Sequence, residues 1–182
     1  MPELPEVETI ANGVHARVHG QRIASVWTSG KPQTFKSPEP EIATALTGAT
    51  IQSVRRVGKT IVMTLQRGAS KKHSEFLIHL GMTGRLLVSD AGVPQPPHTH
   101  AILTLADARE IRFVDPRRFG RLSIHSLNVG APGLAPENWA GAPQNYTGPG
   151  REPLTISLED FIALFRGRKT TIKAALLNQS LL

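Results

Sequence analysis

The sequence predicts a mainly β protein with helices (α+β), in which an N-terminal β-sandwich begins with a helix and is followed by the start of a helical domain. Three observations lead to this prediction: an amphipathic stretch near the N-terminus, a regular series of short segments rich in β-branched residues, and two helical patterns near the C-terminus. The 182 residues, 40% of them apolar, suit one folded domain plus part of another.

The first helix is predicted from Glu6 onward, where apolar residues recur every three or four positions. Pro5 lies near the first turn, where a missing N–H carries no penalty, and Gly20 follows the last apolar position. The predicted apolar stripe consists of Val7, Ile10, Ala11, Val14 and Val18.

Short strand-like segments follow the helix and are separated by Gly, Pro, Ser and Asp. They cover residues 23–28, 50–57, 60–65, 75–80, 85–88, 100–105, 110–114 and 121–125. This pattern indicates a sandwich or barrel of mainly antiparallel strands, interrupted by a short helix at 39–46. We therefore assign residues 1–127 to the N-terminal domain.

Residues 128–153 contain ten Gly or Pro residues in 26 and are predicted to be a linker. Ser157 is predicted to cap a helix that ends at Gly167, and Thr170 or Thr171 to cap another. The last apolar pattern is unfinished at the C-terminus. Residues 154–182 are therefore expected to begin a helical domain that is incomplete, as in a fragment.

The charge balance favours a polyanionic partner, because 21 Lys and Arg residues outnumber 14 Asp and Glu residues and give a net charge of +7. Nucleic acid is the favoured partner, although ribosomal and membrane-surface proteins share this balance. No stretch approaches the roughly 18 to 20 apolar residues of a membrane span. The absence of cysteine excludes disulfides and thiolate zinc sites in this chain, and it is compatible with a reducing cytoplasm.

The opening MPELPEVET is predicted to supply a nucleophile. Removal of Met1 gives Pro2 a free secondary amine, and an α-amino group has a pKa of about 7.7 to 8.0, so an appreciable fraction is neutral. Such an amine can form an iminium with an aldehyde-like carbon, and Glu3 or Glu6 can transfer protons beside it. The alternative is that Pro2 and Pro5 only start a helix whose positive end the glutamates favour. The N-terminus alone does not decide between these readings.

Three further motifs follow in order: RRVGKTIVMTL (55–65), HLGMTGRL (79–86) and DPRRFGRL (115–122). With the opening, they resemble the formamidopyrimidine-DNA glycosylases, bacterial base-excision repair enzymes that remove oxidised purines. The final RKTTIKAALLNQSLL is similar to the start of that family's helix–two-turns–helix domain. The PEVE run favours this family over the related endonuclease VIII group.

The resemblance implies a bifunctional DNA glycosylase/AP lyase. Pro2 matches the nucleophile that attacks C1′ and forms a Schiff base, after which β,δ-elimination cuts the strand. Glu3 matches the proton donor, Lys59 the proton donor for the lyase step, and Glu6 a supporting acid. Without the motif, Lys59 would be interpreted as a solvated lysine in a turn.

The resemblance also implies residues that bind DNA. Removing a nucleotide from the stack leaves a void, and Met82, Arg117 and Phe119 match the residues that fill it. Taken alone, Met82 and Phe119 would more often belong to a core. The further predicted DNA-binding residues are His79, His98, Arg118, Lys169 and Lys173.

Four of these also have ordinary readings: His79 as a satisfied core histidine, and Arg118, Lys169 and Lys173 as solvated charges. His98 and His100 could suggest a metal site, but two histidines do not complete a coordination sphere. The family usually has an acidic residue at the position of Thr99. We predict no metal site in this chain.

Full-length members of the family end in a four-cysteine zinc finger, so zinc is expected for the full-length protein and not for these 182 residues. The expected partner is double-stranded DNA containing oxidised purines (8-oxoguanine, formamidopyrimidines) or abasic sites. A monomer in the bacterial cytoplasm, associated with the nucleoid, is also expected. As a fragment, the chain is expected to bind DNA poorly but to keep some lyase activity. The alternative is a non-catalytic module that binds distorted DNA.

Overall fold

The computed structural model describes residues 2–68, 73–127, 157–168 and 170–176. By its internal contacts the chain divides into two units, Met1–Gly130 and Ala131–Leu182. The predicted linker 128–153 lies outside the described residues.

The N-terminal helix α1 covers Leu4–Val18 and begins two residues earlier than the apolar pattern predicts. Glu3 is its N-cap residue and has an extended backbone, and Pro5 occupies the first turn. The buried stripe consists of Val7, Ala11, Val14 and Val18. The early start follows from the prolines and the N-cap, because a helix can begin before its first buried residue.

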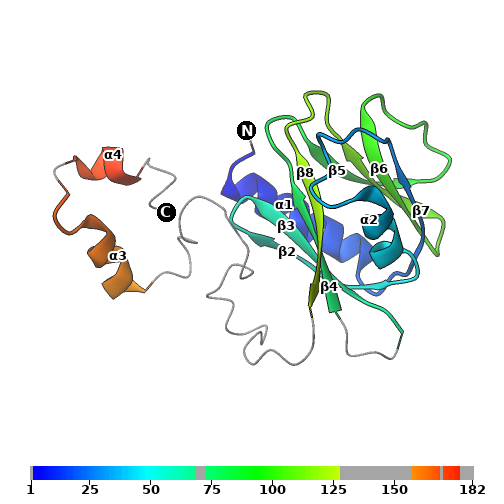
Figure 1. Cartoon of the computed structure of the whole chain (residues 1–182), viewed down its shortest axis with the longest axis horizontal. Helices are drawn as coiled ribbons and strands as arrows, with labels where there is room; N and C mark the ends of the chain where they lie inside the picture. Colours follow the sequence, from blue (N-terminus) through cyan, green and yellow to red (C-terminus); the bar gives the residue numbers. More distant parts are fainter. Residues whose placement is uncertain (1, 69–72, 128–156, 169, 177–182) are drawn as a thin grey trace. The chain divides into compact units, whose positions relative to one another are not determined.

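Two four-stranded antiparallel sheets form the body of the first unit (Figure 1). One sheet has the order β1-β6-β7-β5 and consists of β1 (Ile23–Thr28), β6 (Thr99–Leu105), β7 (Arg109–Val114) and β5 (Arg85–Asp90). The other has the order β2-β3-β4-β8 and consists of β2 (Thr50–Val57), β3 (Thr60–Gln66), β4 (His73–His79) and β8 (Arg121–Leu127). The predicted fold class is confirmed.

One hydrophobic cluster joins both sheets to the helices. It includes Val14 of α1, Ile42 of α2 (Glu39–Leu46), Met63 of β3 and Phe113 of β7, all nearly inaccessible to solvent. The two sheets and α1 therefore share one core, and α1 is fixed at the sheet that carries β2 and β3.

The strand register brings three cationic or titratable side chains to one end of the second sheet. Val57 pairs with Thr60 across a two-residue turn, Gly58-Lys59. Thr60 pairs with His79, and His79 pairs with Arg121. Lys59, His79 and Arg121 therefore lie at the same sheet end.

The second unit contains α3 (Leu158–Phe165) and α4 (Ile172–Leu176). Ser157 caps α3 as predicted, because its Oγ accepts a 3.1 Å hydrogen bond from the backbone N–H of Asp160. Among the helices in the described part of the chain, none is long and apolar enough to cross a membrane.

Candidate active site

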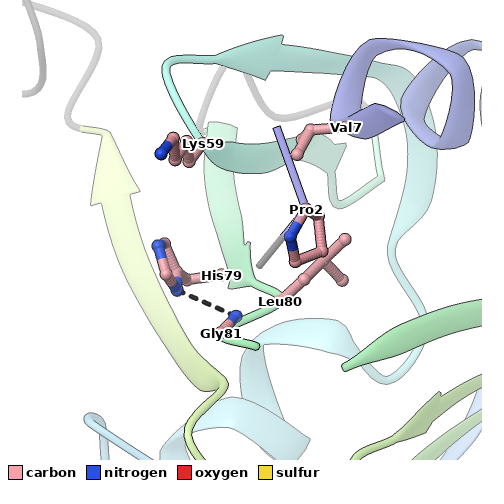
Figure 2. Close-up of a pocket in the computed structure, with 6 residues that line it drawn as sticks. All are labelled: Pro2, Val7, Lys59, His79, Leu80 and Gly81. Carbon is pink, nitrogen blue, oxygen red and sulfur yellow. Dashed lines mark hydrogen bonds between the residues drawn. The ribbon is translucent and has the colours of Figure 1, made fainter. Parts of the chain in front are cut away.

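A shallow hollow lies where the start of α1 meets the Lys59 end of the second sheet (Figure 2). We call it the N-terminal hollow. It is lined by Pro2, Val7, Lys59, His79, Leu80 and Gly81. The structure therefore brings together the predicted nucleophile, the predicted lyase proton donor and one predicted DNA-binding histidine. The ring nitrogen of Pro2 faces the side of the hollow where Lys59 and His79 lie (Figure 2).

Glu3 and Glu6 lie at the helix start beside Pro2. The backbone N–H of Glu3 donates a 3.2 Å hydrogen bond to Oε2 of Glu6, and the Glu3 side chain accepts in turn from the backbone N–H of Glu6, so the two residues form a capping box. Both side chains are exposed. Glu6 therefore holds the backbone that leads into Pro2, while the Glu3 carboxylate is accessible at the edge of the site.

Lys59 is positioned by a tight hairpin turn. Gly58 has φ +54°, the left-handed region that favours glycine at the first central position of a type II′ turn. Nη1 of Arg56 donates a 3.1 Å hydrogen bond to the carbonyl of Gly58, and its Nε donates at 2.6 Å to Oε2 of Glu8 on α1. One guanidinium thus ties the turn that carries Lys59 to the helix that begins beside Pro2.

His79 is held in its neutral form. Its Nδ1 accepts a 3.1 Å hydrogen bond from the backbone N–H of Gly81, so the ring proton of the neutral imidazole resides on Nε2. Burial lowers the pKa of His79 below its usual value, and the positive charges of Arg121 and Lys59 lower it further. His79 therefore offers a hydrogen-bond donor at Nε2 without adding a full charge.

The three predicted void-filling residues, which we call the wedge cluster, are exposed on two loops. Met82 is 45% exposed and Phe119 46% exposed, so neither belongs to the core. The guanidinium carbon of Arg117 lies 4.7 Å from the centre of the Phe119 ring, within the range of a cation–π contact. Met82 and Phe119 are therefore accessible to a partner.

Residues 1–122 match the family model described as the formamidopyrimidine-DNA glycosylase N-terminal domain. The chain belongs to the formamidopyrimidine-DNA glycosylase family. A formamidopyrimidine-DNA glycosylase from Herpetosiphon aurantiacus is 36% identical over 185 residues, and one from Acidiphilium cryptum is 39% identical over 182 residues. These alignments cover 100% and 99% of this chain but 62% and 59% of the relatives. The chain thus spans about three fifths of their length.

Solved structures of this family have the same fold. A complex of the Lactococcus lactis Fpg with DNA containing an abasic site matches 100% of this chain and 62% of its own, with a TM-score of 0.75 and 25% identity. A complex of the LlFpg protein with a THF-DNA and an inhibitor matches 69% of this chain and 44% of its own, with a TM-score of 0.62 and 29% identity. The family resemblance drawn from the motifs is confirmed.

Of the other predicted DNA-binding residues, Arg118 and His98 neither line the hollow nor belong to the wedge cluster. Arg118 and His98 are exposed, and both have backbones in the left-handed region, with φ +56° and +64°. Lys173 is exposed on α4 of the second unit, and Lys169 lies outside the described residues. Their DNA-binding roles stay predictions.

The polar residues that hold the site were not predicted from the sequence. Asp115 is fully buried, and its carboxylate accepts hydrogen bonds from groups on both wedge-bearing loops. Arg56 and Glu8, which join the hairpin to α1, were also missed. The Asp-Pro dipeptide was a usable signal for Asp115, because it favours turn initiation.

The zinc expected for full-length members does not fit the residues present. The chain contains no cysteine. In the part of the chain that the structure describes, no three His, Asp or Glu side chains gather closely enough to bind a metal ion.

Proposed function

We propose that this chain carries the catalytic part of a bifunctional DNA glycosylase/AP lyase that removes 8-oxoguanine and formamidopyrimidines from double-stranded DNA. The observation that carries the proposal is the placement of Pro2, Lys59 and His79 around one hollow. The names of the relatives and the abasic-site DNA in a solved family complex support it.

The reaction begins when Met1 is removed and Pro2 becomes a neutral secondary amine. At a pKa of about 7.7 to 8.0, a useful fraction of such amines is unprotonated near neutral pH. The nitrogen bonds to C1′ while the C1′–N bond to the damaged base breaks, and the base leaves with the electron pair and takes up a proton. The amine proton is lost, and the C1′–O4′ bond opens with its electron pair going to O4′, which takes up a proton. The nitrogen lone pair then forms the iminium with C1′.

Strand cleavage then follows from the iminium, which withdraws electrons from the sugar. Loss of a C2′ proton expels the 3′ phosphate (β-elimination), and loss of a C4′ proton expels the 5′ phosphate (δ-elimination). We assign proton transfer to Glu3, the N-cap residue that follows Pro2 in the chain, and to Lys59, which lines the hollow together with Pro2. The half-buried Lys59 ammonium also suits a flanking phosphate.

Two features suit the His79 side of the hollow and the exposed loops to DNA. His79 presents Nε2 as a neutral donor, which suits a phosphate oxygen or sugar oxygen. The wedge cluster offers a flexible thioether, a guanidinium and an aromatic ring, which can replace a flipped nucleotide in the stack. With a net charge of +7, we expect a monomer that acts on DNA in the bacterial cytoplasm.

The proposal is tested by borohydride trapping on a duplex with a single abasic site. Borohydride reduces an iminium to a stable amine, so a covalent DNA adduct is expected, and peptide mapping should locate it at Pro2. The matched control is the same chain with Met1 retained through an N-terminal extension, because an acylated proline cannot form an iminium.

Loss of the adduct in the extended chain supports the Schiff-base mechanism. If a folded chain with Met1 confirmed absent gives no adduct, the proposal is wrong for this polypeptide. Tight binding to the abasic duplex without an adduct would instead favour the non-catalytic DNA-binding module.

A further inference from the structure

The two loops that carry the wedge cluster touch through their main chains. Residues 80–84 join β4 to β5, and residues 115–120 join β7 to β8. A Cβ added at Gly81 would lie 2.5 Å from the backbone nitrogen of Gly120, and one added at Gly120 would lie 2.9 Å from the carbonyl oxygen of His79. Side chains longer than hydrogen are therefore excluded at this contact.

A buried carboxylate spans the same contact. Oδ1 of Asp115 accepts a hydrogen bond of 2.5 Å from the hydroxyl of Thr83 on the first loop and one of 3.2 Å from the backbone N–H of Arg117 on its own loop. Oδ2 accepts one of 2.7 Å from the backbone N–H of Gly120. Asp115 itself is 0% exposed.

The main chain of Asp115 is held as firmly as its side chain. Its N–H donates a 3.0 Å hydrogen bond to the carbonyl of His98. Its carbonyl lies 3.0 Å from Nε2 of the buried His100, whose Nδ1 lies 3.0 Å from the hydroxyl of Ser29. A carbonyl accepts only, so Nε2 donates to it. The main chain of Asp115 is therefore bonded to His98 and to His100 of β6, and these bonds fix the point from which its carboxylate extends.

Burying a carboxylate is unfavourable unless hydrogen bonds offset the loss of hydration. Three donors converge on Asp115, and Thr83 is the donor from the other loop. A purely structural contact between two loops needs no buried charge, because apolar packing serves as well or better. The carboxylate instead adds geometric specificity, because each hydrogen-bond donor must occupy a fixed position around its oxygens.

We propose that Asp115, acting through Thr83, is a positioning residue that sets Met82 against Arg117 and Phe119, so that the wedge cluster enters the base stack as one unit. The inference rests on the proposed function, in which these three side chains fill the void of a flipped nucleotide. Met82 immediately precedes Thr83, whose hydroxyl donates to Asp115. Arg117 donates its own backbone N–H to the same carboxylate. Asp115 therefore holds both loops of the wedge cluster.

The test uses a duplex in which 2-aminopurine stands opposite a tetrahydrofuran residue. This sugar analogue cannot form a Schiff base, so the fluorescence of 2-aminopurine reports filling of the void independently of the chemistry. The variants are Thr83→Val, which removes the donor while keeping the shape, and Thr83→Ser, which keeps the hydroxyl. Thr83 is half-buried, so both substitutions are compatible with folding, and circular dichroism checks this. Asp115→Asn is a second variant, since an amide cannot accept every bond that the carboxylate accepts.

At saturating protein, we expect Thr83→Val and Asp115→Asn to give less than about half of the fluorescence change of the wild type, and Thr83→Ser to restore it. A full change in Thr83→Val, an equal loss in Thr83→Ser, or no change with the wild type would overturn the inference. Borohydride trapping of the wild type is measured separately. If the wild type gives no trapped adduct, the proposed function is wrong. The fluorescence comparison still tests the role of Asp115, because it does not depend on the Schiff base.

Discussion

Oε2 of Glu8 on α1 accepts a 2.6 Å hydrogen bond from Nε of Arg56 on β2, and this ion pair joins the helix that starts beside Pro2 to the strand that leads to Lys59. The Arg56 side chain is only 7% exposed, whereas Glu8 is 47% exposed. The buried member of the pair is therefore the cation, and its partner is supplied by the helix. The helix beside the proposed nucleophile and the strand that leads to Lys59 are thus joined by a contact between residues that are 48 positions apart.

Glu8→Ala is expected to disturb this alignment. Removing the carboxylate takes one acceptor from a largely buried guanidinium, and solvent near Glu8 limits the loss of stability to about 1 kcal/mol. The variant should remain folded, so this loss of stability alone should leave the rate of borohydride trapping at an abasic site almost unchanged. We expect the trapping rate to fall nevertheless, because the ion pair no longer joins the helix beside Pro2 to the turn that carries Lys59. Glu8→Gln is the control, since its amide oxygen still accepts from Arg56. Equal trapping rates for Ala and wild type would contradict the anchoring role.

Lys59→Ala is expected to slow strand cleavage at an abasic site by about a hundredfold, the usual size of a lost proton-transfer group. Lys31→Ala is the charge-matched control, because Lys31 is exposed on the loop after β1. Single-turnover cleavage at saturating protein separates the two contributions of Lys59. If saturation restores the wild-type rate, Lys59 acts only in binding and its assigned role in proton transfer is wrong.

Much of the fold followed from local patterns. The limits of β1 and β2 were predicted to the residue, because β-branched runs ended at Ser, Gly or Pro. The order of strands in the sheets was not predictable in this way. Ile23 of β1 pairs with Leu105 of β6, and no local pattern specifies a partner 82 positions away.

The candidate site was predictable where family motifs marked it. Pro2 and Lys59 were found from short motifs, and the structure brings them to one hollow. Asp115 was missed because aspartate is usually exposed, and only its place between two loops shows why it is buried. The Arg117–Phe119 contact likewise depends on loop geometry that residue types do not specify.

The low pKa of His79 predicts a specific pH dependence of stability. Burial and the charges of Arg121 and Lys59 favour the neutral ring in the folded protein. As the pH falls below the ordinary histidine pKa of 6.5, the unfolded chain binds a proton that the folded chain does not. The contribution of His79 to stability is therefore complete above that pKa and is lost as the pH falls toward the lowered pKa of the folded state.

Thermal unfolding between pH 5 and 8, the range in which histidines titrate, measures this contribution. His79→Gln is the matched variant, because its amide oxygen can accept from the N–H of Gly81 but does not titrate in this range. The wild type should lose stability on acidification more steeply than His79→Gln. Parallel curves would show that His79 is not held neutral.

Gly81 and Gly92 provide the sharpest comparison of two glycines in this chain. Gly81 has φ +64°, and a Cβ there would lie 2.5 Å from backbone atoms of Gly120 and Phe119, which cannot move as a flexible side chain would. Gly92 has no heavy atom within 4 Å of its added Cβ. Gly81→Ala should therefore lower the free energy of unfolding by at least about 2 kcal/mol, and Gly92→Ala should change it by less than about 0.5 kcal/mol.

Urea unfolding of both variants measures this difference, with the slope of the transition as a check that the denatured states are alike. The 2-aminopurine duplex adds a functional readout, because separating Gly81 from Gly120 also separates Met82 from Phe119. A Gly81→Ala variant as stable as Gly92→Ala would mean that the two loops are not in main-chain contact. The wedge cluster would then consist of two parts that move independently, and the positioning role proposed for Asp115 would be wrong.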